Sequence, residues 1–506
     1  MQGKRDRNRE LLDAAALCRQ LVPDGSVEAF LADHRQDLFP DEMFSEMFSS
    51  GRGRPSVPAD VVATVMVLQA LEGLSDREAA RALRDRISWK VAAGLALDDE
   101  GFDHTVLTYW RARLRASDKP NRIFEAVRAV VADTGVLKGR NRRALDSTVL
   151  DDAVATQDSV TQLISAIRRV RRLVPVAAEV DVAAHDYEAA GKPVVAWDDP
   201  VAKQALITAL VDDALAIIDA LEGIVLSNDQ ADAVGLLALV AGQDVEPADQ
   251  PGTWRIARRV APDRVVSTVD PEARHAHKSP SQRRDGYKSH MAAEPETGII
   301  TGVALTPANA PDGPSAVGLL DAEKDPVEVL GDSAYGSGPT RAALAAKRHR
   351  AVIKPIPLRP AVPGGLGKGD FDIDLETNTV TCPAGHSVSF GRSLKARFTP
   401  HCAGCPLRAR CTRSAQGKVL TINPYEPELA DARAQAATPE FVTTYRRFRP
   451  MAERTIAWLV AKGNRRVPYR GVVRNDQWLH TRAAAVNLRR LVRLGLDHDG
   501  GWVLTP

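Results

Sequence analysis

The chain has 506 residues, which at about 100–200 residues per domain indicates roughly three structural units. Its hydrophobic fraction of 44% and charged fraction of 26% are those of an ordinary folded protein, so extensive disorder is excluded. No stretch approaches ~18 consecutive apolar residues, and the N-terminus lacks the apolar core of a cleavable signal. A membrane span is therefore not expected, and the expected location is the cytoplasm.

The formal net charge of +2 conceals two segments of opposite charge. Residues 441–496 hold 13 Lys or Arg and 2 acids, whereas residues 176–250 hold 2 Lys and 15 Asp or Glu. A dense basic segment favours contact with a phosphate backbone, because each neutralised phosphate releases counterions. The alternative is a solvated helical face. The basic run surrounds an acid on an apolar stripe, which favours nucleic acid.

Residues 1–125 predict a helical unit. Residues 57–71 form its broadest apolar helix, with Ser56 before it and Pro58 in its first turn. Ser75 and Glu78 have the spacing of a capping box at the start of the next helix. Short helices with exposed arginines are typical of a helix-turn-helix DNA reader, and small helical bundles without DNA are the alternative. The arginines expected to contact DNA are Arg81, Arg84, Arg86, Arg111 and Arg113.

From about residue 140 onward, strand patterns alternate with helices. Strands are predicted at 143–150, 253–260, 264–270, 287–295, 299–306 and 327–332, and helices at 122–138, 313–322 and 340–348. Pro295 to Gly298 forms the turn of a hairpin. Residues 157–250 return to helix and contain the acidic segment. The pattern predicts an α/β fold with a mixed sheet and an acidic helical insertion.

Three acids occupy positions suited to divalent metal ions that assist phosphodiester chemistry. Asp146 lies inside a β-like run, Asp332 ends an apolar strand, and Glu453 follows Pro450 in what reads as a first helical turn, on the apolar stripe. The alternatives are a turn residue, a helix cap and a favourable charge at a helix start. Asp270 is the second candidate for the first acid, because it too ends a predicted strand.

Four of the five cysteines lie within one Pro- and Gly-rich stretch. A Cys-x₂-Cys pair with two further cysteines suits tetrahedral Zn²⁺, and a disulfide is not expected in the cytoplasm. The expected structural zinc ligands are Cys382, Cys402, Cys405 and Cys411, with His386 or His401 as substitutes. The alternative is a set of reduced thiols. Cys18 stands alone and is expected to serve packing.

The acids belong to an ordered series of motifs. The series is Asp146-Ser-Thr, Asp270-Pro-Glu272, Asp285-Gly-Tyr-Lys-Ser-His290, Asp332-Ser-Ala-Tyr-Gly336, and Tyr445, Arg449 and Glu453. It resembles the signature of the insertion-sequence DDE transposases of the IS-1182 family, related to the IS-4 and IS-5 types, over nearly the whole chain. The long gaps between the acids depart from a compact core, and the acidic and Cys-rich insertions fill them.

The resemblance implies an RNase H-like catalytic core in which Asp146, Asp332 and Glu453 hold two Mg²⁺ (or Mn²⁺) ions. It also implies that Tyr445 and Arg449 touch DNA near the cut. Residues expected to grip phosphates are Arg465, Arg466, Arg470 and Arg474. The division expected is 1–125 for a DNA-binding unit, 140–375 for the first part of the core including 157–250, 376–416 for a zinc-ribbon-like insertion, and 417–496 for the rest of the core.

The expected function is cleavage at insertion-sequence ends and strand transfer into target DNA. The partner is then double-stranded DNA, both terminal inverted repeats and target, bound in the nucleoid by a homodimer because an element has two ends. Two alternatives remain open. One is a DNA-binding transposase descendant without catalysis, and the other is an RNase H-like metal-dependent nuclease without strand transfer.

Overall fold

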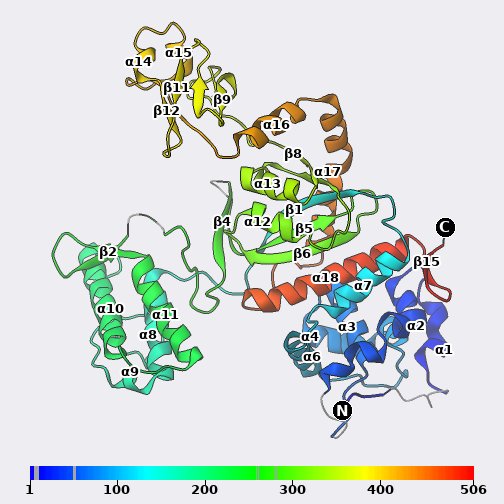
Figure 1. Ribbon diagram of the computed structural model, residues 1–506. Helices are drawn as coiled ribbons and strands as arrows, with labels where there is room; N and C mark the ends of the chain where they lie inside the picture. Colours follow the sequence, from blue (N-terminus) through cyan, green and yellow to red (C-terminus); the bar gives the residue numbers. More distant parts are fainter. Residues whose placement is uncertain (5–10, 49–52, 258, 260, 280–281, 506) are drawn as a thin grey trace.

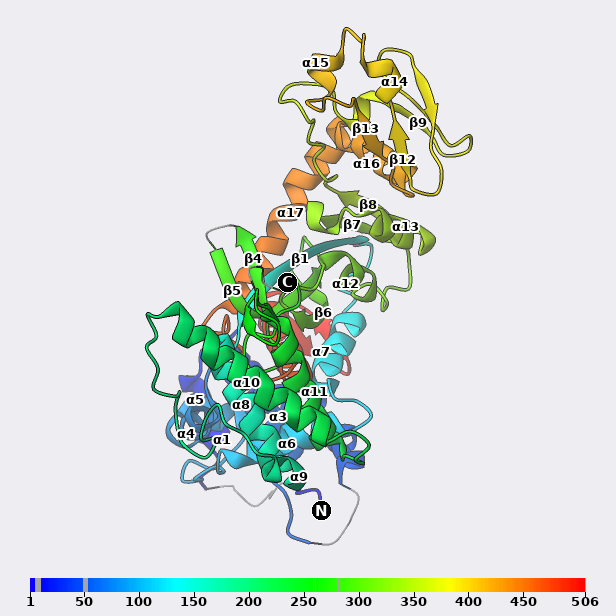
Figure 2. The same cartoon turned by 90° about the vertical axis from the view of Figure 1, so that its left-hand side faces the viewer.

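The computed structural model describes residues 1–4, 11–48, 53–257, 259, 261–279 and 282–505 (Figure 1). A helical unit and a mixed sheet share the centre of the molecule, and two smaller lobes project from them (Figures 1 and 2). The C-terminus returns to the N-terminal helical unit. None of the helices in the described part of the chain combines the length and the apolar character that a membrane crossing requires.

The N-terminal unit consists of short helices around one central helix. Their bounds are α1 Ala14–Cys18, α2 Val27–Leu38, α3 Ala59–Glu72, α4 Asp76–Asp85, α5 Ile87–Ala93, α6 Thr105–Ala116 and α7 Arg122–Asp133. Helix α3 is buried almost all round, as its broad apolar side predicts. The capping box of Ser75 and Glu78 is confirmed: Glu78 N–H donates to Ser75 Oγ, and Ser75 N–H donates to the Glu78 carboxylate. Ser56, by contrast, does not cap α3, because its hydroxyl binds Gly3 and Val57.

The central sheet is mixed. Its strands are β1 Arg142–Asp151, β4 Arg274–Ser279, β5 Gln282–Ala293, β6 Ile300–Pro307, β7 Glu328–Gly331 and β8 Arg350–Ile353. Strand β1 lies at the centre, antiparallel to β5 and parallel to β7, and β7 is parallel to β8. Strands β4 and β6 both pair with β5 in antiparallel fashion, and residues 294–299 close the predicted β5–β6 hairpin.

Helices cover both faces of the parallel half of the sheet. Because side chains alternate along a strand, Leu145 and Val329 point to one face, where they pack with α12 (Asp312–Gly318) and α13 (Gly338–Ala346). Ala144 and Leu330 point to the other face and pack against α17 (Pro439–Val460). Helix α18 (Val472–Arg493) runs between β6 and the N-terminal helices α3 and α7. Asp146 shares the parity of Ala144 and therefore faces α17.

Gly286 allows β5 to lie close to the end of β1. Its φ of 145° is outside the range of ordinary L-residues, and a Cβ would lie 2.2 Å from the carbonyl oxygen of Leu150. The glycine of the Asp285-Gly-Tyr motif is therefore required by the packing of the two central strands.

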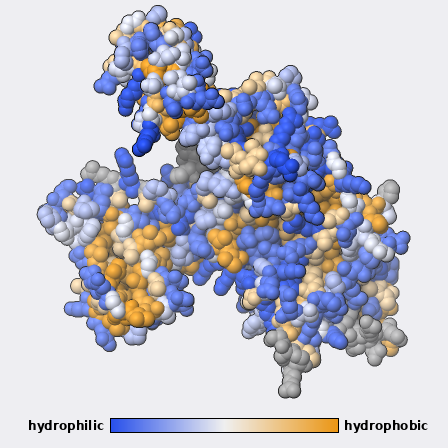
Figure 3. All heavy atoms as spheres, viewed as in Figure 1, coloured by the Kyte–Doolittle hydropathy of each residue, from blue (hydrophilic) through white to orange (hydrophobic). Residues whose placement is uncertain are grey.

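The acidic insertion forms a lobe with its own hydrophobic core. It consists of α8 Ser159–Leu173, α9 Pro175–Glu179, α10 Pro200–Ala220, α11 Asn228–Gln243, and the short strands β2 Val245–Pro247 and β3 Trp254–Ile256. Figure 3 shows apolar side chains gathered on the surface of this lobe. Its exposed large hydrophobic residues are Val176, Val194, Trp197, Val201, Leu215, Ile224, Val225, Leu239 and Ile256.

The Cys-rich segment forms the second lobe, beyond β8 and α16 (Glu426–Ala436), at the far end of the molecule from the N-terminal unit (Figures 1 and 2). It is built from β9 Asp372–Asp374, β10 Thr379–Thr381, β11 Ser387–Ser389, β12 Lys395–Arg397, α14 Thr399–Cys402, α15 Arg408–Cys411 and β13 Val419–Thr421. Phe371, Phe390 and Phe398 fill its small core.

The strand predicted at 264–270 does not form. Thr268 N–H donates to the Gln157 side chain, and Val269 N–H donates to the Ser267 hydroxyl. Side chains thus take the place of the backbone hydrogen bonds between strands. The strand predicted at 253–260 is reduced to β3, and residues 258 and 260 lie outside the described residues. The predicted helix 122–138 ends at Asp133, where Thr134 follows and residues 135–139 form turns.

Arg482 joins the N-terminal unit to the core. Its buried guanidinium donates hydrogen bonds to carbonyl oxygens at the ends of α3 and α17, at 2.7 Å for Trp458, 2.9 Å for Leu459 and 3.1 Å for Leu71. Carbonyl groups at helix C-termini lack partners within their own helix and carry partial negative charge. One side chain on α18 therefore satisfies two helix ends at once.

Replacing Arg482 by Met should lower the free energy of unfolding by about 3 kcal/mol, because buried carbonyls lose charged donors. The urea midpoint of the first unfolding transition measures this effect. Arg493→Met, at an exposed position of the same helix, should change the midpoint little. Equal midpoints for the two variants would show that Arg482 does not tie the units together.

Candidate functional site

Asp146 forms a largely buried ion pair with Arg449. Its Oδ1 lies 3.0 Å from Nη2 of Arg449, and its Oδ2 accepts a hydrogen bond from Nη1 at 3.3 Å. Ser147 N–H donates to the same carboxylate at 3.0 Å. The two side chains are only 15% and 8% exposed. A carboxylate in the middle of a central strand is thus compensated by a cation from α17, as the burial of a charge requires.

Asp332 follows the end of β7, the neighbour of β1. Its side chain accepts a hydrogen bond from Ala334 N–H at 2.9 Å and caps the short 3₁₀ turn Ser333–Tyr335. Gly336 closes this turn, and a Cβ there would lie 2.7 Å from the carbonyl oxygen of Lys354. The cap interpretation for Asp332 is therefore correct, but one carboxylate oxygen beyond the cap bond is available to a ligand.

The charges of Asp146 and Asp332 affect each other. Burial raises the pKa of Asp146, Arg449 opposes this shift, and the nearby negative charge of Asp332 adds to it. The pKa of Tyr445 is raised too, by burial first and then by the same two carboxylates, with Arg449 opposing. Two carboxylates and a phenol thus meet around one arginine, where additional positive charge would be stabilised.

Glu453 lies on α17 one turn after Arg449, but it is exposed and makes no hydrogen bond or ion pair within the described residues. Its expected position on the buried stripe is wrong. Pro450 does not start the helix either: α17 starts at Pro439 with Thr438 as its cap, and Pro450 is internal. Positions 445, 449 and 453 are each four residues apart and share one side of the helix. Glu453 is thus aligned with Arg449, although the structure does not place it against Asp146.

Tyr445 is half-buried beside this pair. Its ring stacks on Phe441 at 5.7 Å between centroids, and Nζ of Lys354 lies 4.8 Å from its centroid. Lys354 is exposed at the end of β8 and was not among the residues predicted for the site. The signal for it was weak: a cation at the carboxyl end of a parallel strand, which is where α/β sheets bind ligands.

Asp270, the second candidate for the first acid, has its carboxylate occupied by hydrogen bonds within the fold. Both of its carboxylate oxygens accept from the Tyr287 hydroxyl at 2.7 Å, and Gly471 N–H donates to it at 3.2 Å. It is 1% exposed. Burial together with Asp270 raises the pKa of Tyr287 far above its ordinary value. The residue joins β5 to the start of α18.

Asp146 and Asp332 fit a divalent metal by the chemistry of their donor atoms. They offer carboxylate oxygens, which hard cations such as Mg²⁺ prefer, and their mutual repulsion would be relieved by a cation. Arg449 now occupies both oxygens of Asp146. A metal ion there would therefore have to share Asp146 with Arg449 or displace it.

The N-terminal arginines differ in their availability. Arg81, Arg84, Arg86 and Arg113 are exposed, and Arg113 lies over the Phe48 ring at 4.9 Å. Arg111 is 6% exposed, pairs with Asp76 and lies over Tyr469 at 5.2 Å. Its expected exposure is wrong, because α6 turns that side toward α4 and the C-terminal segment.

The basic C-terminal segment is partly tied to the sheet. Arg465 donates to Thr148 and Val149 at 3.2 and 3.3 Å, and Arg466 donates to the carbonyl of Asp152 at 3.0 Å. These contacts hold the loop after α17 against β1, close in sequence to Asp146. The segment keeps eight exposed cations, Arg446, Arg447, Arg454, Lys462, Arg466, Arg470, Arg474 and Arg493.

An open cleft separates this segment from the N-terminal helices. Its lining includes Arg77, His104 and Arg111 from the helical unit and Arg466 and Tyr469 from the C-terminal segment. Cations and an aromatic ring on both walls are the side chains that bind phosphates and stack on bases. The predicted DNA-reading unit and the basic segment thus meet at one cleft.

The four clustered cysteines surround one small cavity in the second lobe, together with His386 and His401. Cys402 and Cys411 are buried, and Cys382 and Cys405 are partly buried. Burial raises the pKa of Cys411, and the charges of the three other cysteines raise it further. The His386 and His401 rings stack at 4.7 Å. Four sulfurs that converge on one cavity, with two imidazoles beside them, fit a structural zinc site.

Comparison with protein families gives two matches. A family described as Transposase domain (DUF772) matches residues 18–113, and a family described as Transposase DDE domain matches residues 381–492. The first covers most of the N-terminal helical unit, and the second covers most of the Cys-rich lobe, α17 and most of α18. Asp146 and Asp332 lie between the matched segments.

No curated protein and no solved structure matches the chain. The second match includes Tyr445, Arg449 and Glu453, the last motif of the series, and the other motifs lie outside both matched segments. Such families process DNA, and their DDE domains generally use a divalent metal. Together, the two matched segments indicate an insertion-sequence DDE transposase of the IS-1182-like type.

Proposed function

We propose that this transposase cleaves DNA at the ends of its insertion sequence and joins the freed 3′ ends to target DNA. The observation that carries the proposal is the largely buried Asp146 on the central strand, which pairs with Arg449 of α17 and feels the charge of Asp332 at the end of β7. In transposases such acids act on phosphodiester bonds through bound metal. The family match on α17 supports this assignment.

The proposed core is RNase H-like. Support comes from the strand order, in which the first strand is central, an antiparallel hairpin lies on one side and two parallel strands lie on the other. Helices on both faces of the sheet agree with it. The insertion 157–250 would enter this core after β1, and the lobe 376–416 after β8. Both insertions lengthen the sequence between the acids without separating the strands that carry them.

Each residue has a proposed role. Asp146 and Asp332 hold the metal ions, and Glu453 completes the set when DNA binds and α17 adjusts. Two Mg²⁺ (or Mn²⁺) ions would activate the attacking water or 3′-hydroxyl and stabilise the leaving oxygen. Arg449 orients Asp146 and keeps it ionised before metal binds. Tyr445 and Lys354 border the site and contact the DNA strand near the cut.

The N-terminal helices and the basic C-terminal segment are proposed to hold the terminal inverted repeat across their shared cleft. The exposed arginines on both walls would neutralise phosphates. Affinity should then fall steeply with salt, with a slope of about −0.9 per phosphate contact.

Replacing both Arg470 and Arg474 by Gln should reduce the magnitude of this salt slope by about 2, because each exposed arginine would neutralise one phosphate. Fluorescence anisotropy of a labelled repeat duplex over a range of KCl concentrations measures it. The matched control replaces Arg172 and Lys203, exposed on the insertion lobe, by Gln. An equal change in both double variants would indicate that only the net charge matters.

The Cys-rich lobe is proposed to hold one structural Zn²⁺ through Cys382, Cys402, Cys405 and Cys411. The metal would stabilise a lobe whose own core is small. The lobe presents Arg408 and Arg410 near the cluster and would serve as a DNA contact.

The insertion lobe is proposed to contact the second subunit of a homodimer, which would bring two element ends together. Its exposed apolar residues, which include Trp197 and Val225, support a protein contact. Its acidic charge suggests the alternative that it masks a basic surface until DNA arrives. Removal of residues 176–250 should change the oligomeric state in the first case and the DNA affinity in the second. Unchanged values for both would discard both ideas.

The proposed function is tested with purified protein, Mg²⁺ and a labelled duplex that ends in the inverted repeat flanking the coding sequence. Nicking at the repeat boundary, loss of nicking with EDTA, and joining of a pre-cut end to a plasmid are expected. Nicking without joining would favour the nuclease alternative. Tight repeat binding without either reaction would favour the binding-only descendant.

A further inference from the structure

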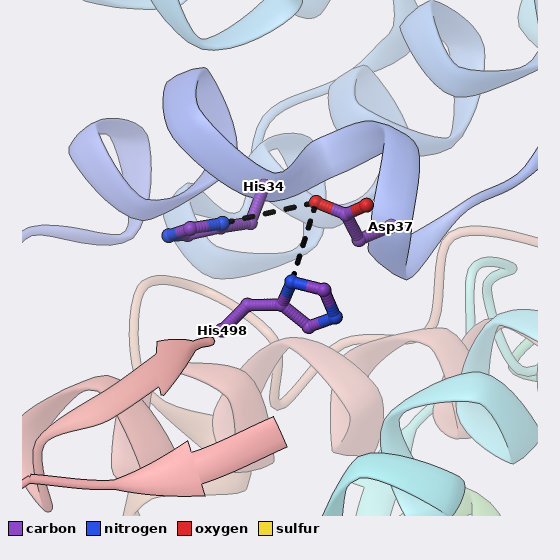
Figure 4. A group of neighbouring side chains, drawn as sticks. All are labelled: His34, Asp37 and His498. Carbon is purple, nitrogen blue, oxygen red and sulfur yellow. Dashed lines mark ion pairs between the residues drawn. The ribbon is translucent and has the colours of Figure 1, made fainter. Parts of the chain in front are cut away.

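We propose a second metal site, for Zn²⁺, formed by His34 and Asp37 of α2 and His498 of the C-terminal hairpin of β14 (Leu496–His498) and β15 (Trp502–Leu504). Figure 4 shows one carboxylate oxygen of Asp37 between a nitrogen of His34 and a nitrogen of His498, which come from the two ends of the chain. The site is separate from the carboxylates of the sheet and from the cysteine lobe, and it does not rest on the proposed reaction.

The geometry is that of ligands around a centre. Nδ1 of His34 lies 3.8 Å and Nδ1 of His498 lies 3.9 Å from Oδ2 of Asp37. All three ligand atoms lie within 4.8 Å of one another. These separations are too long for hydrogen bonds. The two distances to Asp37 exceed by about 0.5 Å the spacing of about 3.4 Å between two ligands of a tetrahedral Zn²⁺ with bonds near 2.0–2.1 Å. The two histidine nitrogens lie within 4.8 Å of each other and would move closer together around an ion.

A second carboxylate supports a metal rather than a simple ion pair. The other nitrogen of His34, Nε2, lies 3.4 Å from Oδ1 of Asp497. Asp497 is held in turn, because its Oδ1 accepts a hydrogen bond from the backbone N–H of His498 at 2.8 Å. A histidine that binds metal through one nitrogen almost always gives its other N–H to a carboxylate, carbonyl or water. His34 is placed for this arrangement, because Nδ1 lies on the side of Asp37 and Nε2 lies on the side of Asp497.

The donor set selects the class of metal. Two imidazoles and one carboxylate suit Zn²⁺ and similar transition metals, whereas Mg²⁺ prefers oxygen ligands alone. The side chains of His34, Asp37 and His498 are 21%, 44% and 27% exposed, so an ion can enter from solvent. Ion pairs between partly exposed side chains add little stability. Ion pairing alone therefore does not explain why these three side chains lie together.

A bound ion would fasten the C-terminal hairpin to the N-terminal unit. Residues 34 and 498 lie near opposite ends of the chain, and apolar contacts already join the same elements. Trp502 lies 5.9 Å from Phe30 and 4.6 Å from His498 between ring centroids. The ring contacts place the hairpin, and the metal would prevent it from opening. Zinc should therefore raise the melting temperature of the intact chain.

The test measures Zn²⁺ binding to the full-length protein in excess Mg²⁺ by isothermal titration calorimetry, and Co²⁺ binding by absorption. His34→Gln and His498→Asn should each lose one equivalent of Zn²⁺ relative to wild type. The lost equivalent should lack the thiolate charge-transfer band of Co²⁺, because no sulfur is a ligand. Asp497→Asn should keep the equivalent but bind it about 10–100-fold more weakly.

Asp499→Asn is the matched control, because Asp499 is exposed in the turn of the same hairpin. It should bind as wild type does. Far-UV circular dichroism in EDTA confirms that each variant folds, and Asp37→Asn provides a third variant on α2. Equal zinc stoichiometry and affinity in wild type and all three ligand variants would overturn the proposal. A lost equivalent that carries the thiolate band would overturn it too.

Discussion

Replacing Asp332 by Asn should reduce the single-turnover nicking rate on a repeat-end duplex about 10³-fold or more. Asp332 ends the strand next to Asp146, and its charge acts on that residue. Metal ions stabilise the transition state of such reactions by several kcal/mol, and each 1.36 kcal/mol corresponds to a factor of ten. Asn retains the side-chain oxygen that accepts from Ala334 N–H. The substitution should therefore weaken the contact with the metal ions and leave the turn after β7 intact.

The control for this substitution is Asp325→Asn, an exposed residue in the loop before β7. It should nick at the wild-type rate, and both variants should bind the repeat within about twofold of wild type, because neither removes a cation. Nicking by Asp332→Asn at more than a tenth of the wild-type rate would contradict the assignment of Asp332. Loss of nicking in both variants would point to the loop rather than to the metal site.

Local signals in the sequence predicted the elements that carry the site. The run around Asp146 predicted the central strand, and the capping box of Ser75 and Glu78 predicted the start of α4. Both depend on residues within a few positions, where periodicity and capping are decisive. The turn after β7 was also predictable from the sequence, because a segment of small residues follows an apolar strand.

Long-range partners were not predictable from the sequence. Arg449 was expected to touch DNA, but in the structure it pairs with Asp146, 303 residues away. Arg111 was expected to be exposed, and it pairs with Asp76 across two helices. A charged residue on a helix has the same local pattern whether its partner is solvent, DNA or a distant carboxylate. Only the folded chain distinguishes these cases.

Two errors came from local signals that tertiary structure overrode. Pro450 was read as a helix start, but α17 continues through it, since its first turn already begins at Pro439 with Thr438 as cap. The run 264–270 had strand composition, yet side chains of Gln157 and Ser267 take its backbone hydrogen bonds. The proposed site of His34, Asp37 and His498 was not predicted, because its residues come from opposite ends of the chain.

Replacing Arg449 by Gln should shift the acid limb of the pH–nicking profile to higher pH and reduce nicking at pH 7 by about tenfold. Asp146 must be ionised to bind metal. Burial raises its pKa, and Arg449 is the strongest influence that lowers it again. Without Arg449 the pKa of Asp146 rises further, so a larger fraction of the protein carries a protonated Asp146 at each pH near that value. Each pKa unit corresponds to about 1.36 kcal/mol of lost stabilisation of the carboxylate. The shift is measured from single-turnover nicking rates at saturating Mg²⁺ between about pH 5.5 and about pH 9, a range that extends to both sides of neutrality.

The sign can be checked by stability as well. A carboxyl whose pKa is raised in the folded state binds its proton more tightly there than in the unfolded chain. Its ionisation therefore costs stability as pH rises from the ordinary value of 3.8 through the raised pKa. Arg449→Gln should thus lose more unfolding free energy between mild acid and neutral pH than wild type does. Arg446→Gln, an exposed neighbour on α17, should show neither effect.

A second consequence of the ion pair separates two roles for Arg449. Because its guanidinium contacts both oxygens of Asp146, removal of Arg449 could instead free the carboxylate for metal. If Arg449 mainly blocks the site before DNA arrives, Arg449→Gln would nick at lower Mg²⁺ concentrations than wild type, with the acid limb unmoved. If it mainly keeps Asp146 ionised, as proposed, more alkaline pH should restore nicking toward the wild-type rate. The low exposure of both side chains favours the second outcome, because in a buried site the cost of an unpaired carboxylate exceeds the gain from an open ligand position.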